Sequence, residues 1–219
     1  MPRKNLIRSN HFPYHVTARA NNKCPFPLDL TIVWKVATEE LYSLSVLYEI
    51  EIHAFVVMPN HFHLLLTVPN EDLGKIMNLF MSNITRILNK LSGKSGHVFG
   101  GPYFWSIITS TRYFGHVLKY VYRNPVKGGL CLQVEEYEFS TASGTFGIHF
   151  LPIPIHLTRL GLELNLPETT NPNGWLEWLN RPFPGETEKL IQQCMRKKKI
   201  DELLNRNKRR AQRELSQLL

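Results

Sequence analysis

Short apolar runs and longer apolar stripes alternate along the chain, and their spacing predicts its elements. Runs that are rich in β-branched and aromatic residues predict four strands. They span residues 11–19, 50–58, 61–68 and 103–109. Pro59 and Asn60 stand between the second and third runs, and both residue types are frequent in turns. The two middle strands are therefore expected to form a hairpin.

Two apolar stripes with helical spacing separate these strands. Residues 29–48 carry the first stripe, and Asp29 is a favourable N-cap. Residues 71–91 carry the second and clearer stripe, with Asn70 ahead of it and Gly93 behind it as expected caps. Each stripe predicts a helix with one buried face.

A third helix is expected over residues 111–123. It should stop near Asn124, because Pro125 disfavours the helical conformation of the residue before it. The resulting order of strand, helix, strand, strand, helix, strand is the split βαβ pattern. The predicted fold class is α+β, with a ferredoxin-like βαββαβ antiparallel sheet, helices on one face, the extra third helix and a C-terminal helical extension.

The composition changes at about residue 150. The stretch LPIPIHLTRLGLELNLPETTNPNGW is rich in proline and asparagine and predicts a linker or an irregular subdomain. Beyond Cys194 the chain has helical propensity and carries a run of Lys and Arg from Arg196 to Arg213. We therefore expect a main domain at 1–149 and an extension at 150–219.

The net charge of +8, from 26 Lys and Arg against 18 Asp and Glu, suits a polyanionic partner such as nucleic acid. The three cysteines are far apart in sequence and include no CxxC pair, which argues against a disulfide framework or a cysteine zinc site. The basic N-terminus lacks an apolar core, and no stretch approaches the roughly 20 apolar residues of a membrane span. We expect no membrane partner and a cytoplasmic location.

The motif MPNHFH places His61 and His63 two residues apart in a predicted strand. Alternate residues of a strand point to the same face, so the two imidazoles can hold one metal ion. The alternative is that one histidine is hydrogen-bonded in the core and the other lies at an edge. An HxH motif by itself does not decide between them.

Tyr120 and Asn124 lie four residues apart in the predicted third helix. Their side chains share one face, so a phenol and a carboxamide can approach the same point. Tyr122 lies about 200° from Tyr120 around a regular helix, so only one of the two tyrosines can face that point. The alternative role for such a tyrosine is packing against the core.

Two imidazoles and an amide oxygen leave open positions on a divalent ion such as Mg²⁺ or Mn²⁺, which can polarise a phosphate oxygen. A phenol with a free pKa of about 10 is a weak nucleophile at neutral pH and needs such help. Together these parts favour nucleophilic attack by a tyrosine on a phosphodiester.

Three segments carry a resemblance to a known family. HVTARANN at 15–22, FVVMPNHFHLLL at 55–66 and KYVYRNPVKGGL at 119–130 resemble the single-tyrosine, His-hydrophobic-His (IS200-like) transposases that act on single-stranded DNA. The YxxxNPV spacing is similar to the REP-associated tyrosine transposases. Where members often have glycine after the first strand, this chain has Ala20.

The resemblance implies a role for each motif residue. His61 and His63 match the metal-binding pair, Asn124 the third metal ligand, and Tyr120 the nucleophile on a catalytic helix. Residues 1–149 would then form the catalytic domain. Such enzymes cut one DNA strand, keep its end as a 5′-phosphotyrosine, and reseal it to another end.

Basic and amide residues in three places are predicted to contact DNA. They are Arg19, Asn21, Asn22, Arg123, Lys127, Arg196, Lys197, Lys198 and Lys199. The alternative is a solvated turn for the first place and a solvated helix for the last. Phe104 and Trp105 could stack on unpaired bases, or they could pack in the core.

The sequence therefore predicts a metal-dependent transesterase that cleaves and rejoins single-stranded, hairpin-forming DNA. The alternative is a non-catalytic, sequence-specific DNA hairpin-binding protein derived from a transposase. A hydrolase is disfavoured because no Asp or Glu stands beside the HxH motif as a base. The oligomeric state, monomer or homodimer, stays open.

Overall fold

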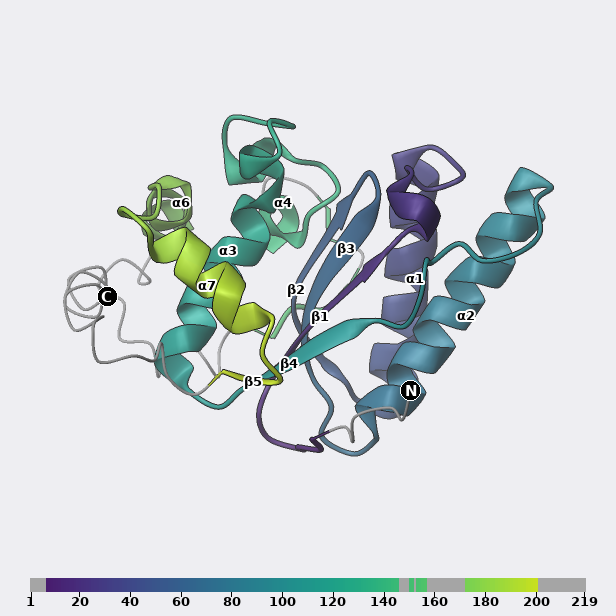
Figure 1. Ribbon diagram of the computed structural model, residues 1–219, viewed down its shortest axis with the longest axis horizontal. Coiled ribbons are helices and arrows are strands. Elements are labelled where there is room, and N and C mark those ends of the chain that lie inside the picture. The colour runs from purple at the N-terminus through teal and green to yellow at the C-terminus, as the bar shows by residue number, and fades with distance from the viewer. Residues whose placement is uncertain (1–6, 146–149, 152, 157–171, 201–219) are drawn as a thin grey trace.

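The computed structural model describes residues 7–145, 150–151, 153–156 and 172–200 of the chain (Figure 1). Most of the predicted linker and the part of the basic tail beyond residue 200 lie outside these described residues.

A five-stranded sheet forms the centre of the fold, with the strand order β2-β3-β1-β4-β5. Its strands are β1 (Tyr14–Arg19), β2 (Glu51–Met58), β3 (His61–Thr67), β4 (Phe104–Ile108) and β5 (Lys199–Ile200). The first four pair antiparallel, whereas β5 pairs parallel to β4. The four predicted strands are confirmed, including the β2–β3 hairpin, and so is the ferredoxin-like α+β fold.

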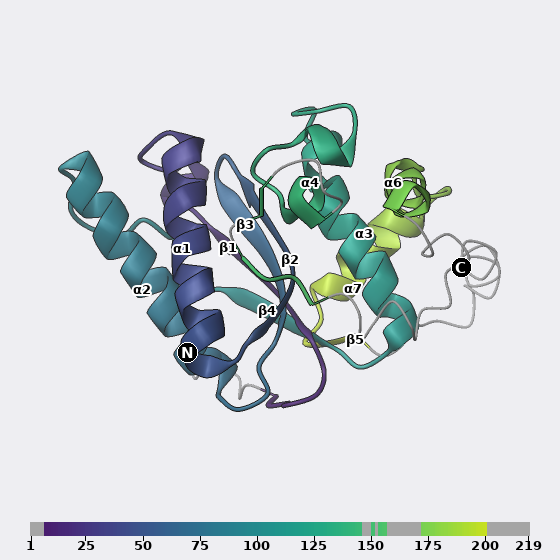
Figure 2. The same ribbon diagram turned by 180° about the vertical axis from the view of Figure 1, so that it is seen from behind.

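The helices α1 (Leu30–Tyr48) and α2 (Leu73–Ser92) cover one face of the sheet, as expected (Figures 1 and 2). Asp29 caps α1 as predicted, because its carboxylate accepts a hydrogen bond from the backbone N–H of Thr31 at 2.8 Å. Gly93 ends α2 in the left-handed conformation with a φ of 64°, which is also as predicted.

Asn70 does not cap α2, so that prediction was wrong. The N-cap is Asp72, whose Oδ1 accepts from the N–H of Gly74 at 2.7 Å. Asn70 instead donates from Nδ2 to Glu49 Oε2 at 2.7 Å. Both residue types favour N-caps, so local preference alone could not choose between them.

The helix α3 (Thr111–Lys127) lies on the other face of the sheet and continues through Pro125 (Figure 2). The predicted end near Asn124 was therefore wrong. Proline has no N–H for the carbonyl of Val121, one turn earlier. The side-chain amide of Asn124 lies 3.4 Å from that oxygen and 2.8 Å from the carbonyl of Tyr120, so it supplies a donor where the backbone cannot.

The remaining elements follow α3 or connect the strands. They are η1 (Asn21–Lys23), η2 (Val134–Glu136), α4 (Thr141–Thr145), α6 (Pro172–Asn180) and α7 (Thr187–Met195). The end of the predicted linker is thus a helix. The predicted helix beyond Cys194 was also wrong for its described part, because α7 ends at Met195 and the chain then pairs with β4 as β5.

The sheet separates two apolar cores. The larger core lies under α1 and α2 and includes Phe80, whose ring meets the rings of Phe55 and Phe62 edge to face. The second core lies between the sheet and α3, and it also takes Trp178 from α6 and Ile191 from α7. The described part of the extension therefore packs on the main domain, and the division at residue 150 stays a prediction.

Tyr122 belongs to the second core. Its side chain is fully buried, and its hydroxyl lies 3.1 Å from Oγ1 of Thr141. Burial raises the pKa of Tyr122 to about 12. Within the described residues, no helix is long and apolar enough to cross a membrane.

Truncation of Phe80 should be strongly destabilising. Its ring is fully buried and contacts Phe55 and Phe62, so Phe80→Ala should lower the free energy of unfolding by about 3–5 kcal/mol. Leu91→Ala, on the same helix but 57% exposed, is the control and should change it by less than about 0.5 kcal/mol. Denaturant titration checks both, and similar losses for the two variants would contradict this packing.

The buried phenol of Tyr122 should make the fold sensitive to alkali. An unfolded tyrosine ionises near its ordinary pKa of 10.0, whereas folded Tyr122 keeps its proton to about 12. The folded state then binds more protons, so this contribution is present below pH 10 and is lost as the pH rises towards 12. Tyr122→Phe should flatten that decline in denaturation curves, and an equal decline would contradict the assignment.

Candidate active site

A cavity of about 400 Å³ opens on the face of the sheet that α3 covers. It gathers side chains from six elements, namely β1, β2, β3, β4, α3 and α7. Its lining is His15, Thr17, Arg19, Met58, His61, His63, Phe104, Tyr120, Asn124, Lys127, Gly128, Gln192, Met195 and Arg196. The predicted metal ligands and the predicted nucleophile therefore meet in one place.

The strand alternation brings the two motif histidines together. His61 and His63 both line the cavity, whereas Phe62 between them is buried in the first core. Their ring centroids are 5.1 Å apart. Antiparallel pairing sets Arg19 opposite His61 and Thr17 opposite His63, so the neighbouring strand β1 supplies the adjoining wall.

Each motif histidine has its Nδ1 engaged by a neighbour. Nδ1 of His61 lies 2.7 Å from Oδ1 of Asn60, and Nδ1 of His63 lies 2.9 Å from Nε2 of the buried His15. Nε2 is therefore the ring nitrogen that remains for a ligand in both residues. Contacts of this kind fix the orientation of metal-binding imidazoles.

Burial keeps these imidazoles neutral at physiological pH. It lowers the pKa of His61 to about 4, with a further contribution from the charge of Arg19. It also lowers the pKa of His63 well below its ordinary value, and that of His15 to about 4. A neutral imidazole is the form that binds a metal.

Of the two tyrosines on α3, Tyr120 faces the cavity. Its ring meets the ring of His63 edge to face, with centroids 6.0 Å apart, and it is 7% exposed. Tyr122 points into the second core, where its hydroxyl contacts Thr141. The expectation that only one of the two could face the site is confirmed by this geometry.

Asn124 also lines the cavity, one turn beyond Tyr120. Its Nδ2 donates to the carbonyl of Tyr120, so Oδ1 is the remaining polar atom of its amide. The described residues form no cluster of three His, Cys, Asp or Glu that could hold a metal ion. His61, His63 and Asn124 instead bring two imidazoles and one amide oxygen to the cavity, and such donors are of the kind that bind divalent ions.

Three of the predicted DNA contacts line the cavity, namely Arg19, Lys127 and Arg196. Lys127 is also paired with Glu188 at 2.8 Å. The positive charge that these three residues bring to the cavity suits an anionic ligand.

Other predicted DNA contacts lie outside the cavity lining. Asn21 and Asn22 are exposed in η1, and Lys197 and Lys199 are exposed near β5. Arg123 donates to the carbonyls of Leu179 and Asn180 at the end of α6. Its guanidinium thus ties α6 to α3, and a DNA contact by Arg123 stays a prediction.

The two aromatic residues of β4 lie on opposite faces of the sheet. Phe104 lines the cavity, whereas Trp105 is buried in the first core. The ammonium of Lys198 lies 4.3 Å from the ring centroid of Phe104 and 4.2 Å from that of Trp105. Core packing is therefore right for Trp105, and stacking on bases remains open for Phe104.

Sequence reasoning missed two residues of the site. His15 lines the cavity, and its Nε2 lies 2.9 Å from Nδ1 of the metal-site candidate His63. Its even offset from Arg19 along the strand could have indicated the shared face. Gln192 donates from Nε2 to the hydroxyl of Tyr120 at 3.2 Å, and no local pattern could have revealed it.

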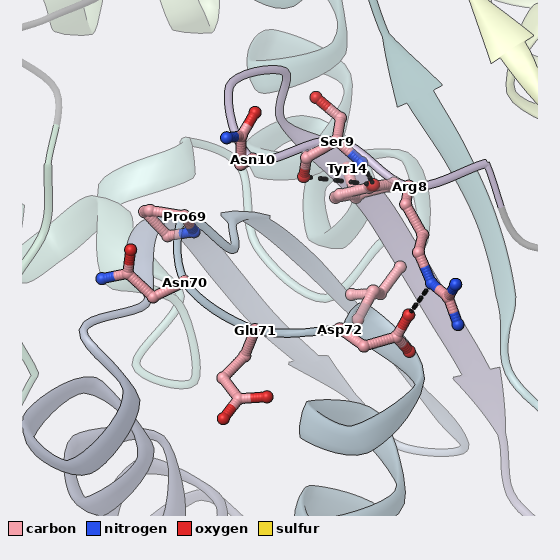
Figure 3. A pocket seen from close by; sticks show the side chains of 9 residues that line it. Arg8, Ser9, Asn10, Tyr14, Pro69, Asn70, Glu71 and Asp72 are labelled. Atoms are coloured by element: carbon pink, nitrogen blue, oxygen red, sulfur yellow. Dashed lines mark hydrogen bonds and ion pairs between the residues drawn. The ribbon is translucent and has the colours of Figure 1, made fainter.

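A second cavity, of about 370 Å³, lies where the N-terminal segment meets the start of α2 (Figure 3). Arg8 and Asp72 form an ion pair there, and the hydroxyl of Tyr14 accepts from the N–H of Ser9 at 2.5 Å. None of the predicted site residues lines it. Arg8 and Asp72 pair with each other, and Glu71 in the same lining pairs with Lys75.

The Ala20 position keeps an ordinary conformation. Its φ of −61° is extended backbone that alanine adopts freely, and its N–H donates to the carbonyl of Asn60 at 2.8 Å. The positive φ values of this turn fall on Asn22 and Lys23 instead. The backbone at residue 20 therefore does not require glycine, and alanine fits the turn beside the histidine motif.

A solved structure shares the fold, and a family model matches the region of the motifs. A similar solved structure is that of a REP-associated tyrosine transposase bound to a REP hairpin, with a TM-score of 0.54, 23% identity, and coverage of 64% of this chain and 82% of that one. A putative transposase from Deinococcus radiodurans has a TM-score of 0.38 and 16% identity, over 54% of this chain and 95% of its own.

In sequence, the chain is 36% identical over 93 residues to the REP-associated tyrosine transposase of Escherichia coli (strain K12). That match covers 42% of this chain and 53% of the relative, so it spans about half of the relative's length. The sequence model of the family described as "Transposase IS200 like" matches residues 9–124, which is more than half of the chain and includes β1 to β4 and the Tyr120–Asn124 pair. The expected resemblance is thus confirmed, and the chain belongs to the IS200-like transposase family.

Proposed function

We propose that this chain is a metal-dependent transesterase that cleaves and rejoins single-stranded DNA at hairpin-forming sequence. The observation that carries the proposal is one cavity of about 400 Å³ that a tyrosine, two histidines and an asparagine line together. The name of the solved relative, which is bound to a REP hairpin, supports the choice of hairpin DNA as substrate.

Tyr120 is the proposed nucleophile. Its hydroxyl oxygen attacks a phosphorus of the DNA, so that an oxygen–phosphorus bond forms and the bond from phosphorus to the 3′-oxygen breaks. The phenol gives up its proton and the leaving 3′-oxygen takes one up, which yields a 5′-phosphotyrosine and a free 3′-hydroxyl. Attack by a 3′-hydroxyl on the phosphotyrosine reverses these changes and reseals the strand without ATP.

His61, His63 and Asn124 are the proposed ligands of Mg²⁺ or Mn²⁺. A bound divalent ion supplies charge that stabilises the phosphate oxygens as the bond is broken. His63 can offer Nε2 only when its proton is on Nδ1, and that proton then bonds to His15 Nε2 across the 2.9 Å contact. His15 thereby holds the ring of His63 in its binding orientation.

The cations around the cavity are the proposed phosphate contacts. Arg19, Lys127 and Arg196 surround the site, and a strand that enters it would meet all three. The exposed Asn21, Asn22, Lys197 and Lys199, together with Lys198, would extend this surface along the DNA.

One chain supplies every proposed catalytic group, since β3 and α3 of the same molecule line the cavity. We therefore propose that the site works in cis and that a monomer is competent. If catalysis instead required a homodimer, the specific activity would depend on protein concentration.

Tyr120→Phe should abolish the covalent adduct between protein and DNA, because it removes the attacking oxygen. A labelled single-stranded hairpin oligonucleotide, incubated with Mn²⁺ and run on a denaturing gel, reports the adduct. The hairpin affinity of Tyr120→Phe should stay within about twofold of the wild type. Tyr122→Phe is the matched control and should still form the adduct, because that hydroxyl lies in the second core.

Two outcomes would contradict this assignment. An adduct in Tyr120→Phe would exclude Tyr120 as the nucleophile. Tight binding by the wild type without an adduct under either ion would favour the non-catalytic hairpin-binding protein.

Mn²⁺ should stabilise the wild-type protein through His61 and His63. A ligand that binds only the folded state at about 100 times its dissociation constant adds about 2.7 kcal/mol to the free energy of unfolding. His61→Ala should remove most of this gain in thermal unfolding. His97→Ala, at an exposed histidine outside the cavity, should keep it, and an equal loss in both variants would count against the site.

A further inference from the structure

Gln192 joins the proposed nucleophile to the C-terminal extension. Its Nε2 lies 3.2 Å from the hydroxyl oxygen of Tyr120 and donates a hydrogen bond to it, and both side chains line the cavity. Gln192 stands on α7, whereas the family match ends at residue 124. The contact therefore comes from a part of the chain outside the residues that the family model matches.

The position of Gln192 is fixed by contacts at both ends of α7. Near its start, Glu188 pairs with Lys127 of α3 at 2.8 Å. At its end, the carbonyl of Met195 accepts a hydrogen bond from Oγ of Ser106, on β4, at 2.7 Å. Gln192 lies four residues after Glu188 and three before Met195, so all three share one face of the helix.

The adjoining side of α7 is anchored in the second core. Ile191 and Cys194 are buried there, at 2% and 8% exposure. After the helix, the N–H of Ile107 donates to the carbonyl of Lys198 at 3.0 Å and β5 pairs with β4. The amide of Gln192 is thus carried by a helix that is packed and tied to the sheet.

The hydrogen bond from Gln192 limits the orientations that the hydroxyl group of Tyr120 can adopt. A hydroxyl has one hydrogen and two lone pairs, and it turns freely about its C–O bond when nothing holds it. The hydrogen bond from Gln192 takes one lone pair, so the other lone pair and the proton are directed elsewhere. Nucleophilic attack uses that second lone pair, and a donor also stabilises negative charge on the oxygen as the proton leaves.

We propose that Gln192 is a positioning residue for the attacking hydroxyl of Tyr120, so that the C-terminal extension completes the active site. The inference rests on the proposed transesterase function and adds a residue to it. Gln192 acts through Tyr120, so its loss should lower the rate of adduct formation and leave DNA binding unchanged.

Gln192→Met is the first test, because methionine has similar length and no donor. In single-turnover reactions with a hairpin oligonucleotide and Mn²⁺, its rate of adduct formation should be about three- to tenfold lower than that of the wild type. Its hairpin dissociation constant should stay within about twofold. Gln193→Met is the matched control, because Gln193 is the exposed neighbour on the same helix and should keep the full rate.

A second pair of variants separates hydrogen bonding from packing. Gln192→Lys keeps a donor, whereas Gln192→Glu keeps the shape of glutamine but has only acceptors when ionised. The rates should fall in the order wild type, Lys, Met, Glu. Glutamine and lysine can donate, although lysine has a different shape, methionine has no donor, and the glutamate carboxylate adds negative charge beside the phenol oxygen. If packing alone mattered, Glu would match the wild type and Lys would be the slowest.

The outcomes distinguish this inference from the function on which it rests. A wild-type rate in Gln192→Met or Gln192→Glu, with adduct still formed, would overturn the role of Gln192 and leave the transesterase intact. A rate loss that is matched by an equal loss of hairpin affinity would also overturn it. No adduct from the wild type would overturn the function and the inference together.

Discussion

The two-residue alternation of the central strands is the constraint on which the rest of the structure depends. On β3, Phe62 is buried beneath α1 and α2, while His61 and His63 line the cavity on the opposite face. On β1, Val16 is buried in the first core and His15 faces the cavity side. A slip of one residue would bury the imidazoles among apolar side chains and open the phenyl ring to the cavity. The apolar packing of one face therefore holds the chemistry of the other face in register.

The polar groups of the cavity are buried, and several of them bond to one another. Burial disfavours charge on His63, and the contact with His15 gives its Nδ1 a partner. Asn124 has a similar double role, because its Nδ2 compensates for the N–H that Pro125 lacks and its Oδ1 remains for the site. Pro125, which was expected to end the helix, thus leaves a carbonyl free for the Asn124 amide. That contact helps to orient Asn124, a proposed metal ligand.

The C-terminal extension covers part of the β4 edge and lines part of the cavity. Without β5, β4 would be an edge strand with unpaired backbone groups. β5 pairs with part of that edge. Ser106 on β4 binds the carbonyls of Met195 and Lys197, which draws the chain away from the helix that its local propensity favours. The same connection places α7 over Tyr120, so the family core and the extension meet at the proposed nucleophile.

Short-range patterns in the sequence determined the strands, the first two helices and the candidate residues of the motif, because apolar periodicity and fixed spacings are local properties. The shared face of His61 and His63 followed from the strand period alone. Tertiary structure decided what depends on distant neighbours. It turned Tyr120 towards the cavity and Tyr122 into the core, and it brought Gln192 to a hydroxyl 72 positions away in sequence. Only packing between elements could set those contacts, since no local spacing records which helix will cover which face of a sheet.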